Sequence, residues 1–114
     1  MSQTIKAGVS ISNIYPICIY SKPMTFEWDE DKALENVRKH RVSFEQAQQV
    51  FNDSRAVPLE DLEHSTLHEL RYLMIGMSSI GLLFVSFTYR DEVVRLISAR
   101  RAEHWMVKVY EDEN

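Results

Sequence analysis

Three stretches in the second half of the chain are mostly apolar and are joined by short links. They cover residues 70–77, 82–89 and 93–100, and they are rich in β-branched and aromatic side chains. Such runs are typical of strands, and the links at 78–81 and 90–92 are short enough for hairpins. We therefore predict an antiparallel meander of three strands.

The first half of the chain has apolar residues at helical spacing. A helix is predicted from about Glu30 to His40, with Asp29 as its N-cap and acidic residues in its first turn. A second helix begins after Ser43, which can form a capping box with Gln46. The predicted packing faces are Ala33, Leu34 and Val37 in the first helix and Phe44, Ala47, Val50 and Phe51 in the second.

Shorter elements complete the predicted fold. Phe26 and Trp28 alternate with polar neighbours, which is typical of a half-buried strand. Residues 55–59 favour a short strand that Pro58 places at a sheet edge, and residues 102–112 favour a last helix. The order β-α-α-β-β-β-β-α predicts an α+β domain in which helices pack on one face of a small antiparallel sheet. The order of the strands within the sheet stays open.

Residues 1–23 differ in character from the rest, with two lysines and no acidic residue. We interpret them as an N-terminal extension before a start at Met24, and an extra edge strand around residues 14–20 is the alternative. They lack the continuous apolar run of a signal peptide. Residues 24–114 are expected to form a single domain.

Composition narrows the class of protein. The 114 residues are 45% hydrophobic and 26% charged, which is ordinary for a soluble globular domain. A formal net charge of −4 argues against a surface coated with basic residues but allows a local basic patch. The chain has one cysteine, Cys18, which cannot form an internal disulfide. It does not cluster with the four histidines, so we expect no metal site, and we expect no cofactor either. No segment is long enough to span a membrane, and the cytoplasm is the expected location.

Arginines interrupt the apolar strands. Arg71 lies in the first predicted meander strand, and Arg95 and Arg100 lie in the third. Because side chains alternate along a strand, Arg95 and Arg100 are predicted on opposite faces. A lone buried guanidinium is costly, so each arginine either binds a carboxylate or joins the others around one anion such as phosphate. Residues 90–108 carry five basic against three acidic side chains. The candidate carboxylates are Glu60, Asp61, Glu63 and Glu69.

Several short motifs stand in order along the chain. A Phe-x-Trp-Asp motif precedes a lysine, a Lys-His pair, a Ser-Phe-Glu, an Arg before an Ile-Gly, and an Ile-Ser-Ala-Arg. With this pattern the sequence over about residues 24–104 resembles the BrnT-type toxins of bacterial type II toxin–antitoxin systems. The motif residues are Phe26, Trp28, Asp29, Lys32, Lys39, His40, Ser43, Phe44, Glu45, Arg71, Ile75, Gly76, Ile97, Ser98, Ala99 and Arg100.

The resemblance implies a RelE-like fold and a metal-independent endoribonuclease that blocks translation. It also implies a partner, a BrnA-like ribbon-helix-helix antitoxin, and contact with operator DNA only through the complex with that antitoxin. The alternative is a catalytically weak or inactive module of the same fold that serves as a co-repressor subunit. An orphan domain whose arginines form structural salt bridges is a third interpretation.

Metal-independent RNA cleavage needs a base near the 2′-oxygen, an acid near the leaving 5′-oxygen and cations around the phosphate. His40 is the first candidate for acid or base because the resemblance maps onto it, and a helix C-terminal cap is the alternative. Tyr110 is a candidate for base stacking or proton donation unless it only packs, whereas His64 and His68 are expected to be solvated. The candidates for charge stabilisation are Arg71, Arg95 and Arg100, and those for RNA binding are Arg101, Lys39, Lys108 and Tyr110.

The sequence departs from the BrnT pattern in two places. A glycine usually follows the Lys-His pair in that family, where it closes the helix with a positive φ, and here Arg41 stands instead. The family's last helix is generally rich in basic residues, but Lys108 is the only lysine or arginine of the last helix here, which weakens the expected contact with RNA phosphates. A candidate docking surface for an antitoxin helix is formed by Trp105, Met106 and Val109.

Overall fold

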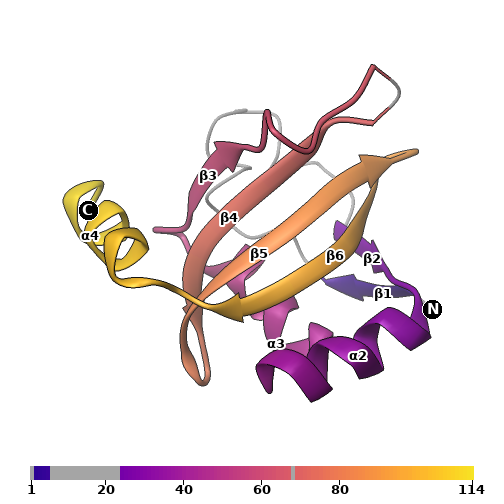
Figure 1. Ribbon diagram of the computed structural model, residues 1–114, viewed down its shortest axis with the longest axis horizontal. Coiled ribbons are helices and arrows are strands. Elements are labelled where there is room, and N and C mark those ends of the chain that lie inside the picture. The colour runs from indigo at the N-terminus through magenta and orange to yellow at the C-terminus, as the bar shows by residue number, and fades with distance from the viewer. Residues whose placement is uncertain (1, 6–23, 68) are drawn as a thin grey trace.

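The computed structural model describes residues 2–5, 24–67 and 69–114. They form an α+β structure, as predicted (Figure 1). The division into an extension and a domain at Met24 stays a prediction, and residues 14–20 lie outside the described residues. The elements are β1 (Ser2–Ile5), β2 (Met24–Glu27), α2 (Glu30–His40), α3 (Phe44–Gln49), the 3-10 helix η2 (Val50–Asn52), β3 (Val57–Glu60), β4 (Arg71–Ser78), β5 (Gly81–Arg90), β6 (Val93–Arg101) and α4 (His104–Asp112).

The strands form one sheet in the order β1-β2-β6-β5-β4-β3. The predicted antiparallel meander is present as β4, β5 and β6, and β3 with its Pro58 lies at an edge as expected. The sheet as a whole is mixed rather than antiparallel, because β2 pairs parallel to β6. The helices α2 and α3 carry the chain from β2 across the sheet to β3 at the far edge, and the strands β3 to β6 then lead back to β2. A long connection of this kind lets the two paired strands run in the same direction.

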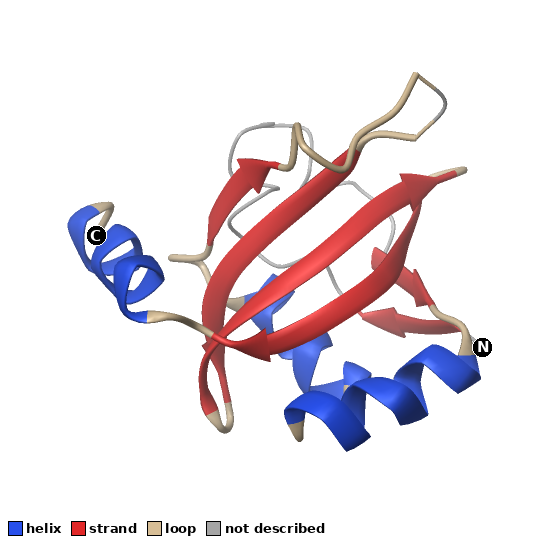
Figure 2. Ribbon diagram, viewed as in Figure 1, coloured by secondary structure: helices blue, strands red, loops and turns tan. Residues whose placement is uncertain are grey.

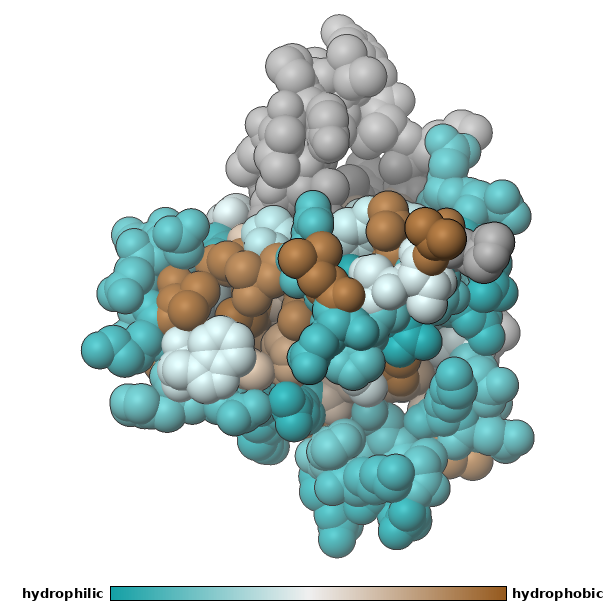
Figure 3. Space-filling model, turned by 45° about the horizontal axis from the view of Figure 1, so that its top comes forward, coloured by the Kyte–Doolittle hydropathy of each residue, from teal (hydrophilic) through white to brown (hydrophobic). Residues whose placement is uncertain are grey.

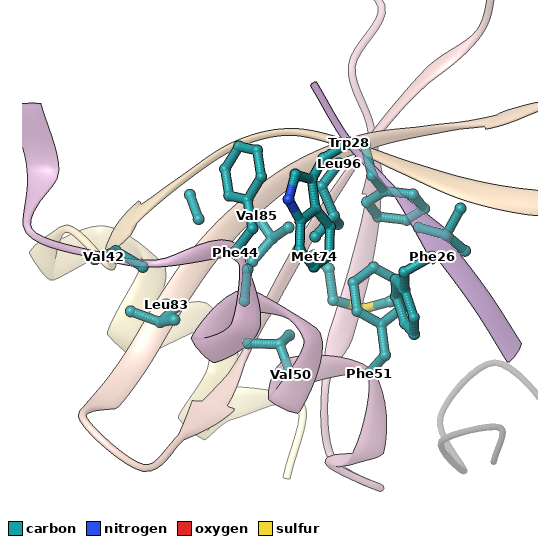
Figure 4. Close-up of a cluster of buried hydrophobic side chains, with 14 of the residues drawn as sticks. Phe26, Trp28, Val42, Phe44, Val50, Phe51, Met74, Leu83, Val85 and Leu96 are labelled. Atoms are coloured by element: carbon teal, nitrogen blue, oxygen red, sulfur yellow. The ribbon is translucent and has the colours of Figure 1, made fainter. Parts of the chain in front are cut away.

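The core lies between the sheet and the pair α2 and α3. The packing face predicted for the second helix, which the structure divides into α3 and η2, is confirmed. Its four residues are all buried: Phe44, Ala47, Val50 and Phe51. Aromatic rings meet edge to face there: the ring centroids of Phe26 and Phe51 are 5.0 Å apart (Figure 4). The predicted capping box of Ser43 is also present and fixes the start of α3.

The predicted packing face of α2 is wrong in two of its three residues. Leu34 and Val37 are 69% and 42% exposed, and the buried residue of this helix is Asn36. Its amide nitrogen donates to the carbonyl oxygens of Val42 (2.8 Å) and Ala99 (2.7 Å), and its oxygen accepts from the Ala99 N–H (3.1 Å). The helix is therefore rotated so that a polar side chain, rather than two aliphatic ones, faces the sheet.

The last helix lies apart from the other two (Figure 2). Met106 of α4 is buried and lines the same hollow as Leu73 and Phe84. The strand neighbours of these two residues belong to the core on the opposite side of the sheet: Met74, Leu83 and Val85. The prediction that all helices pack on one face is thus wrong for α4, which leans on the other face at one end of the sheet. None of the helices in the described part of the chain is long and apolar enough to cross a membrane.

Candidate functional site

A hollow of about 720 Å³ lies on the sheet face that α2 and α3 leave uncovered. It is bounded by the β3–β4 loop, the end of α2 and the start of α4. In Figure 3 apolar side chains gather over this side of the molecule and hydrophilic residues surround them. The floor comes from four adjacent strands and consists of Leu59, Leu73, Phe84, Ser86, Ile97 and Ser98.

An irregularity in β6 decides which arginines face the hollow. Ser86 pairs with Ser98, but the next residue, Phe87, pairs with Leu96, so Ile97 is an extra residue in β6. Such a bulge resets the alternation of side chains. Arg95 and Arg100 therefore lie on the same face of the sheet, and their predicted placement on opposite faces is wrong.

The structure brings three of the four predicted catalytic residues to the hollow. His40 at the end of α2, Arg71 at the start of β4 and Arg100 near the end of β6 all line it. Arg95 does not, because it lies five residues before Arg100, roughly 15 Å along the strand. Its guanidinium instead binds Glu27 of the neighbouring β2 at 2.8 Å.

Both hollow arginines also have a carboxylate partner. Nε of Arg71 lies 3.1 Å from Glu69, and Nη2 of Arg100 lies 3.0 Å from Glu103. The side chains of Arg100 and Glu103 are about half exposed, at 46% and 51%. Exposed ion pairs contribute only about 0–1 kcal/mol, so a phosphate can displace Glu103 from Arg100 at low cost. Both interpretations of the arginines therefore apply in part. All three arginines have a carboxylate partner, and two of them, Arg71 and Arg100, also line the same hollow.

Residues 28–104 match the family model described as "Ribonuclease toxin, BrnT, of type II toxin-antitoxin system". The chain belongs to this family. A comparison with curated proteins gave no match. The BrnT match spans α2 to the start of α4, and so it includes His40, Arg71, Arg100 and the loop between β3 and β4.

The charge of the hollow in this BrnT-family chain is mixed. Glu60, Asp61, Glu63 and Glu103 line it together with the two arginines and two histidines. The excess of basic side chains over residues 90–108 therefore does not make the hollow basic, because acidic residues in β3, in the β3–β4 loop and just before α4 line it as well. A bound RNA phosphate would meet two guanidinium groups beside several carboxylates, which limits electrostatic affinity.

The residues predicted to bind RNA lie outside the hollow. Lys39 and Lys108 are exposed, and Arg101 donates to the Ile80 carbonyl at 2.7 Å. Tyr110 donates its hydroxyl proton to Asp53 at 2.7 Å, and burial together with this bond raises the pKa of Tyr110 to about 12. This bond joins Tyr110 to the chain's own Asp53, in keeping with the packing alternative, and a role in proton donation or base stacking stays a prediction.

The predicted antitoxin surface on α4 is only partly accessible. Met106 is buried against the chain's own sheet and Val109 is half-buried, so neither presents a free apolar surface. Trp105 is 51% exposed and lies at the rim of the hollow. The helix thus uses part of its predicted apolar side to pack against its own sheet.

Sequence reasoning missed a second histidine at the hollow. His64 is exposed, as expected for a loop residue, but its Nδ1 also lies 2.8 Å and 3.0 Å from the two carboxylate oxygens of Asp61. Both residues line the hollow with Arg71 and Arg100. The available signal was the Asp-x-x-His spacing just before the strand that carries Arg71. His68 lies outside the described residues.

Proposed function

We propose that this BrnT-family protein is a metal-independent endoribonuclease that cleaves RNA by attack of a 2′-hydroxyl on the adjacent phosphate. The observation that carries the proposal is one hollow lined by His40, Arg71 and Arg100, which come from three separate elements. A titratable imidazole and two permanent cations are what this reaction needs in place of a metal.

The strand pairing supports a single phosphate position between the two arginines. Arg71 and Arg100 lie on strands separated by β5, roughly 10 Å apart across the sheet and roughly 13 Å apart along it. They approach from opposite ends of the row formed by Leu73, Ser86 and Ser98. A phosphate over the two serines would lie between the arginines, and each guanidinium would have to leave its carboxylate partner to bind it.

The reaction proceeds without a co-reactant. The 2′-oxygen forms a bond to phosphorus, the bond from phosphorus to the 5′-oxygen breaks, and a proton passes from the 2′-hydroxyl to the base and another from the acid to the 5′-oxygen. The products are a 2′,3′-cyclic phosphate and a free 5′-hydroxyl. Arg71 and Arg100 stabilise the extra negative charge of the phosphorane, and His40 takes one of the two proton-transfer roles.

The family assignment supplies the biological setting. A toxin of a type II system has an antitoxin partner, and we infer a ribbon-helix-helix antitoxin of the BrnA-like kind that binds operator DNA in complex with the toxin. We further infer a RelE-like fold, arrest of translation as the effect of RNA cleavage and action in the cytoplasm. The exposed Leu34, Val37 and Trp105 are apolar contacts that such a partner can cover.

A second function is favoured by the carboxylate partners of the arginines. A co-repressor module needs no reactive hollow, and in such a module the pairs Arg71–Glu69 and Arg100–Glu103 would serve only the structure. The α4 helix, with Lys108 as its one lysine or arginine, fits this alternative as well.

The decisive experiment incubates the purified protein with a 5′-labelled single-stranded RNA of mixed sequence in the presence of EDTA. We expect fragments that end in a 2′,3′-cyclic phosphate, no cleavage of the 2′-O-methyl RNA, and a loss of at least about 100-fold in rate for Arg71→Ala and Arg100→Ala. Arg38→Ala is the matched control, because Arg38 is also exposed and paired, with Glu35, but lies outside the hollow. Equal inactivity of wild type and variants, with an intact operator complex, would establish the co-repressor module instead.

A further inference from the structure

We propose that His64 is the general base of the cleavage reaction and that Asp61 orients it, which leaves His40 as the general acid. This inference rests on the proposed function and adds to it the second proton-transfer group. It starts from the hydrogen bond between the two side chains and from their shared place at the hollow.

The Asp61 carboxylate fixes the protonation pattern of the imidazole. Both carboxylate oxygens face Nδ1, at 2.8 Å and 3.0 Å, so Nδ1 carries the proton that is donated. In the neutral ring Nε2 then keeps its lone pair and is the basic nitrogen. The Asp61 side chain is 11% exposed while the His64 side chain is 63% exposed, so the orienting group is protected and the imidazole is open to solvent.

The loop that carries His64 is fastened to the first residue of β4. The Asp61 N–H donates to the carbonyl oxygen of Arg71 (3.0 Å), the Arg71 N–H donates to Oγ of Ser65 (3.0 Å), and that hydroxyl donates to the Asp61 carbonyl (2.7 Å). These bonds fix the position of His64 relative to the residue whose guanidinium lines the hollow. A base must be placed in this way to act on one defined oxygen.

His64 and His40 come to the hollow from opposite sides. The β3–β4 loop leads into the start of β4, whereas α2 packs against β6, and β5 lies between these two strands (Figure 1). In an in-line displacement the attacking 2′-oxygen and the leaving 5′-oxygen lie on opposite sides of phosphorus. A base and an acid on opposite sides of the phosphate site therefore match the geometry of the reaction, and one histidine does not supply both.

The roles follow from the hydrogen bonds. His64 Nε2 accepts the proton of the 2′-hydroxyl as the bond from the 2′-oxygen to phosphorus forms, and Asp61 stabilises the resulting imidazolium. His40 has no carboxylate partner within the described part of the chain. Because it comes from the β6 side of the hollow, opposite His64, it donates its proton to the 5′-oxygen as the bond from phosphorus to that oxygen breaks.

The test is single-turnover cleavage of the 5′-labelled RNA at saturating protein. We expect His64→Gln to reduce the rate by at least about 100-fold, with RNA affinity and melting temperature unchanged. His104→Gln is the matched control, since His104 is an exposed histidine at the start of α4 outside the hollow. For His64→Gly we expect added imidazole to restore part of the rate, which a purely structural role does not allow.

A substrate with a 5′-thio leaving group separates the two histidines. Sulfur leaves without a proton, so the defect of His40→Gln should shrink on this substrate, whereas the defect of His64→Gln should persist. Asp61→Asn should reduce the saturated rate in the wild-type background and have no further effect in the His64→Gln background, because Asp61 is a positioning residue that acts through His64.

Undiminished cleavage by His64→Gln, alongside an active wild type, overturns this assignment and leaves the proposed ribonuclease function standing. A defect of His64→Gln that disappears on the 5′-thio substrate also overturns it, because the two histidines then have the reverse roles. Failure of the wild type to cleave any of these RNAs in EDTA is a failure of the proposed function itself.

Discussion

The side-chain amide of Asn36 binds both backbone polar groups of Ala99, its nitrogen 2.7 Å from the carbonyl oxygen and its oxygen 3.1 Å from the amide nitrogen. The pairing of β2 with β6 ends at Glu27 and Arg95, and among the described residues no strand pairs with the outer edge of β6 beyond that point. Asn36 takes the place of that strand at Ala99. The contact also fastens the last turn of α2, which carries His40, next to Arg100.

Replacing Asn36 by leucine should therefore be costly although the two side chains have a similar size. We expect the free energy of unfolding to fall by about 2–4 kcal/mol, because buried backbone groups of Val42 and Ala99 lose their partners. Urea unfolding measures the change, and Asn52→Leu at an exposed position is the control. A loss below about 0.5 kcal/mol would mean that water replaces the amide without penalty.

Arg41 closes α2 in the left-handed conformation, with φ 60° and ψ 31°. A side chain in this region costs about 1–2 kcal/mol relative to the ordinary helical conformation, and glycine avoids that cost while losing more entropy on folding. Arg41→Gly should therefore stabilise the protein by about 0.5–1 kcal/mol in urea unfolding. Arg41→Ala removes the same side-chain charge but keeps the Cβ, so it should not stabilise, and equal stabilisation by both variants would assign the effect to charge.

Local patterns predicted the elements whose signals lie within a few residues. The bounds of α2, the Asp29 cap, the Ser43 capping box and the β4–β6 meander all depend on neighbours in sequence, and the structure confirms them. The parallel pairing of β2 with β6 and the face chosen by α4 depend on partners far along the chain. No local pattern determines such contacts, and so the predictions of an antiparallel sheet with all helices on one face were wrong.

The candidate site was predictable to a similar extent. The motifs identified His40, Arg71 and Arg100, which meet in one hollow. Sequence reasoning predicted only that His64 is solvated, because the residues of an acidic loop do not indicate where the loop folds. Its position beside the start of β4 follows from the hydrogen bonds among Asp61, Ser65 and Arg71. The sequence did not predict that Asn36 of α2 faces the sheet. An asparagine is buried where backbone groups need a hydrogen-bond partner, and those groups, in Val42 and Ala99, are identified only by the fold.

The hydrogen bond from Tyr110 to Asp53 joins α4 to the segment before β3, and it should make stability depend on alkaline pH. Burial and this bond raise the pKa of Tyr110 to about 12 in the folded protein, above the value of about 10 for an unfolded chain. The stabilising contribution is therefore complete below about pH 10 and is lost as pH rises through about 12. Urea unfolding between pH 9 and pH 12 should show a steeper loss for wild type than for Tyr110→Phe, and parallel curves would contradict the assignment.

Glu103 neutralises one of the two arginines of the hollow, since its carboxylate lies 3.0 Å from Nη2 of Arg100. Glu103→Gln keeps the shape of the side chain but removes the charge that competes with an RNA phosphate. We expect RNA affinity to increase several-fold in fluorescence anisotropy, with a steeper decrease between 50 and 200 mM salt because one more cation is free to replace a counterion. Glu111→Gln, an exposed acid farther along α4, controls for net charge, and an equal increase in both variants would show a long-range effect only.

The bulge at Ile97 gives Arg95 and Arg100 the same face but not the same role. Arg95 binds Glu27 and lies outside the hollow, whereas Arg100 lines it and its guanidinium lies 5.1 Å from the centroid of the Phe84 ring. Arg95→Ala should therefore change the cleavage rate by less than about threefold and cost at most about 1 kcal/mol of stability, the value of a partly exposed ion pair. Arg100→Ala should reduce the rate by at least about 100-fold, because it removes a charge that stabilises the phosphorane.

Single-turnover cleavage and urea unfolding of the two variants in parallel test the distinction. If Arg95→Ala loses as much activity as Arg100→Ala while remaining folded, the phosphate site extends along β6 to β2, and the hollow is only part of it.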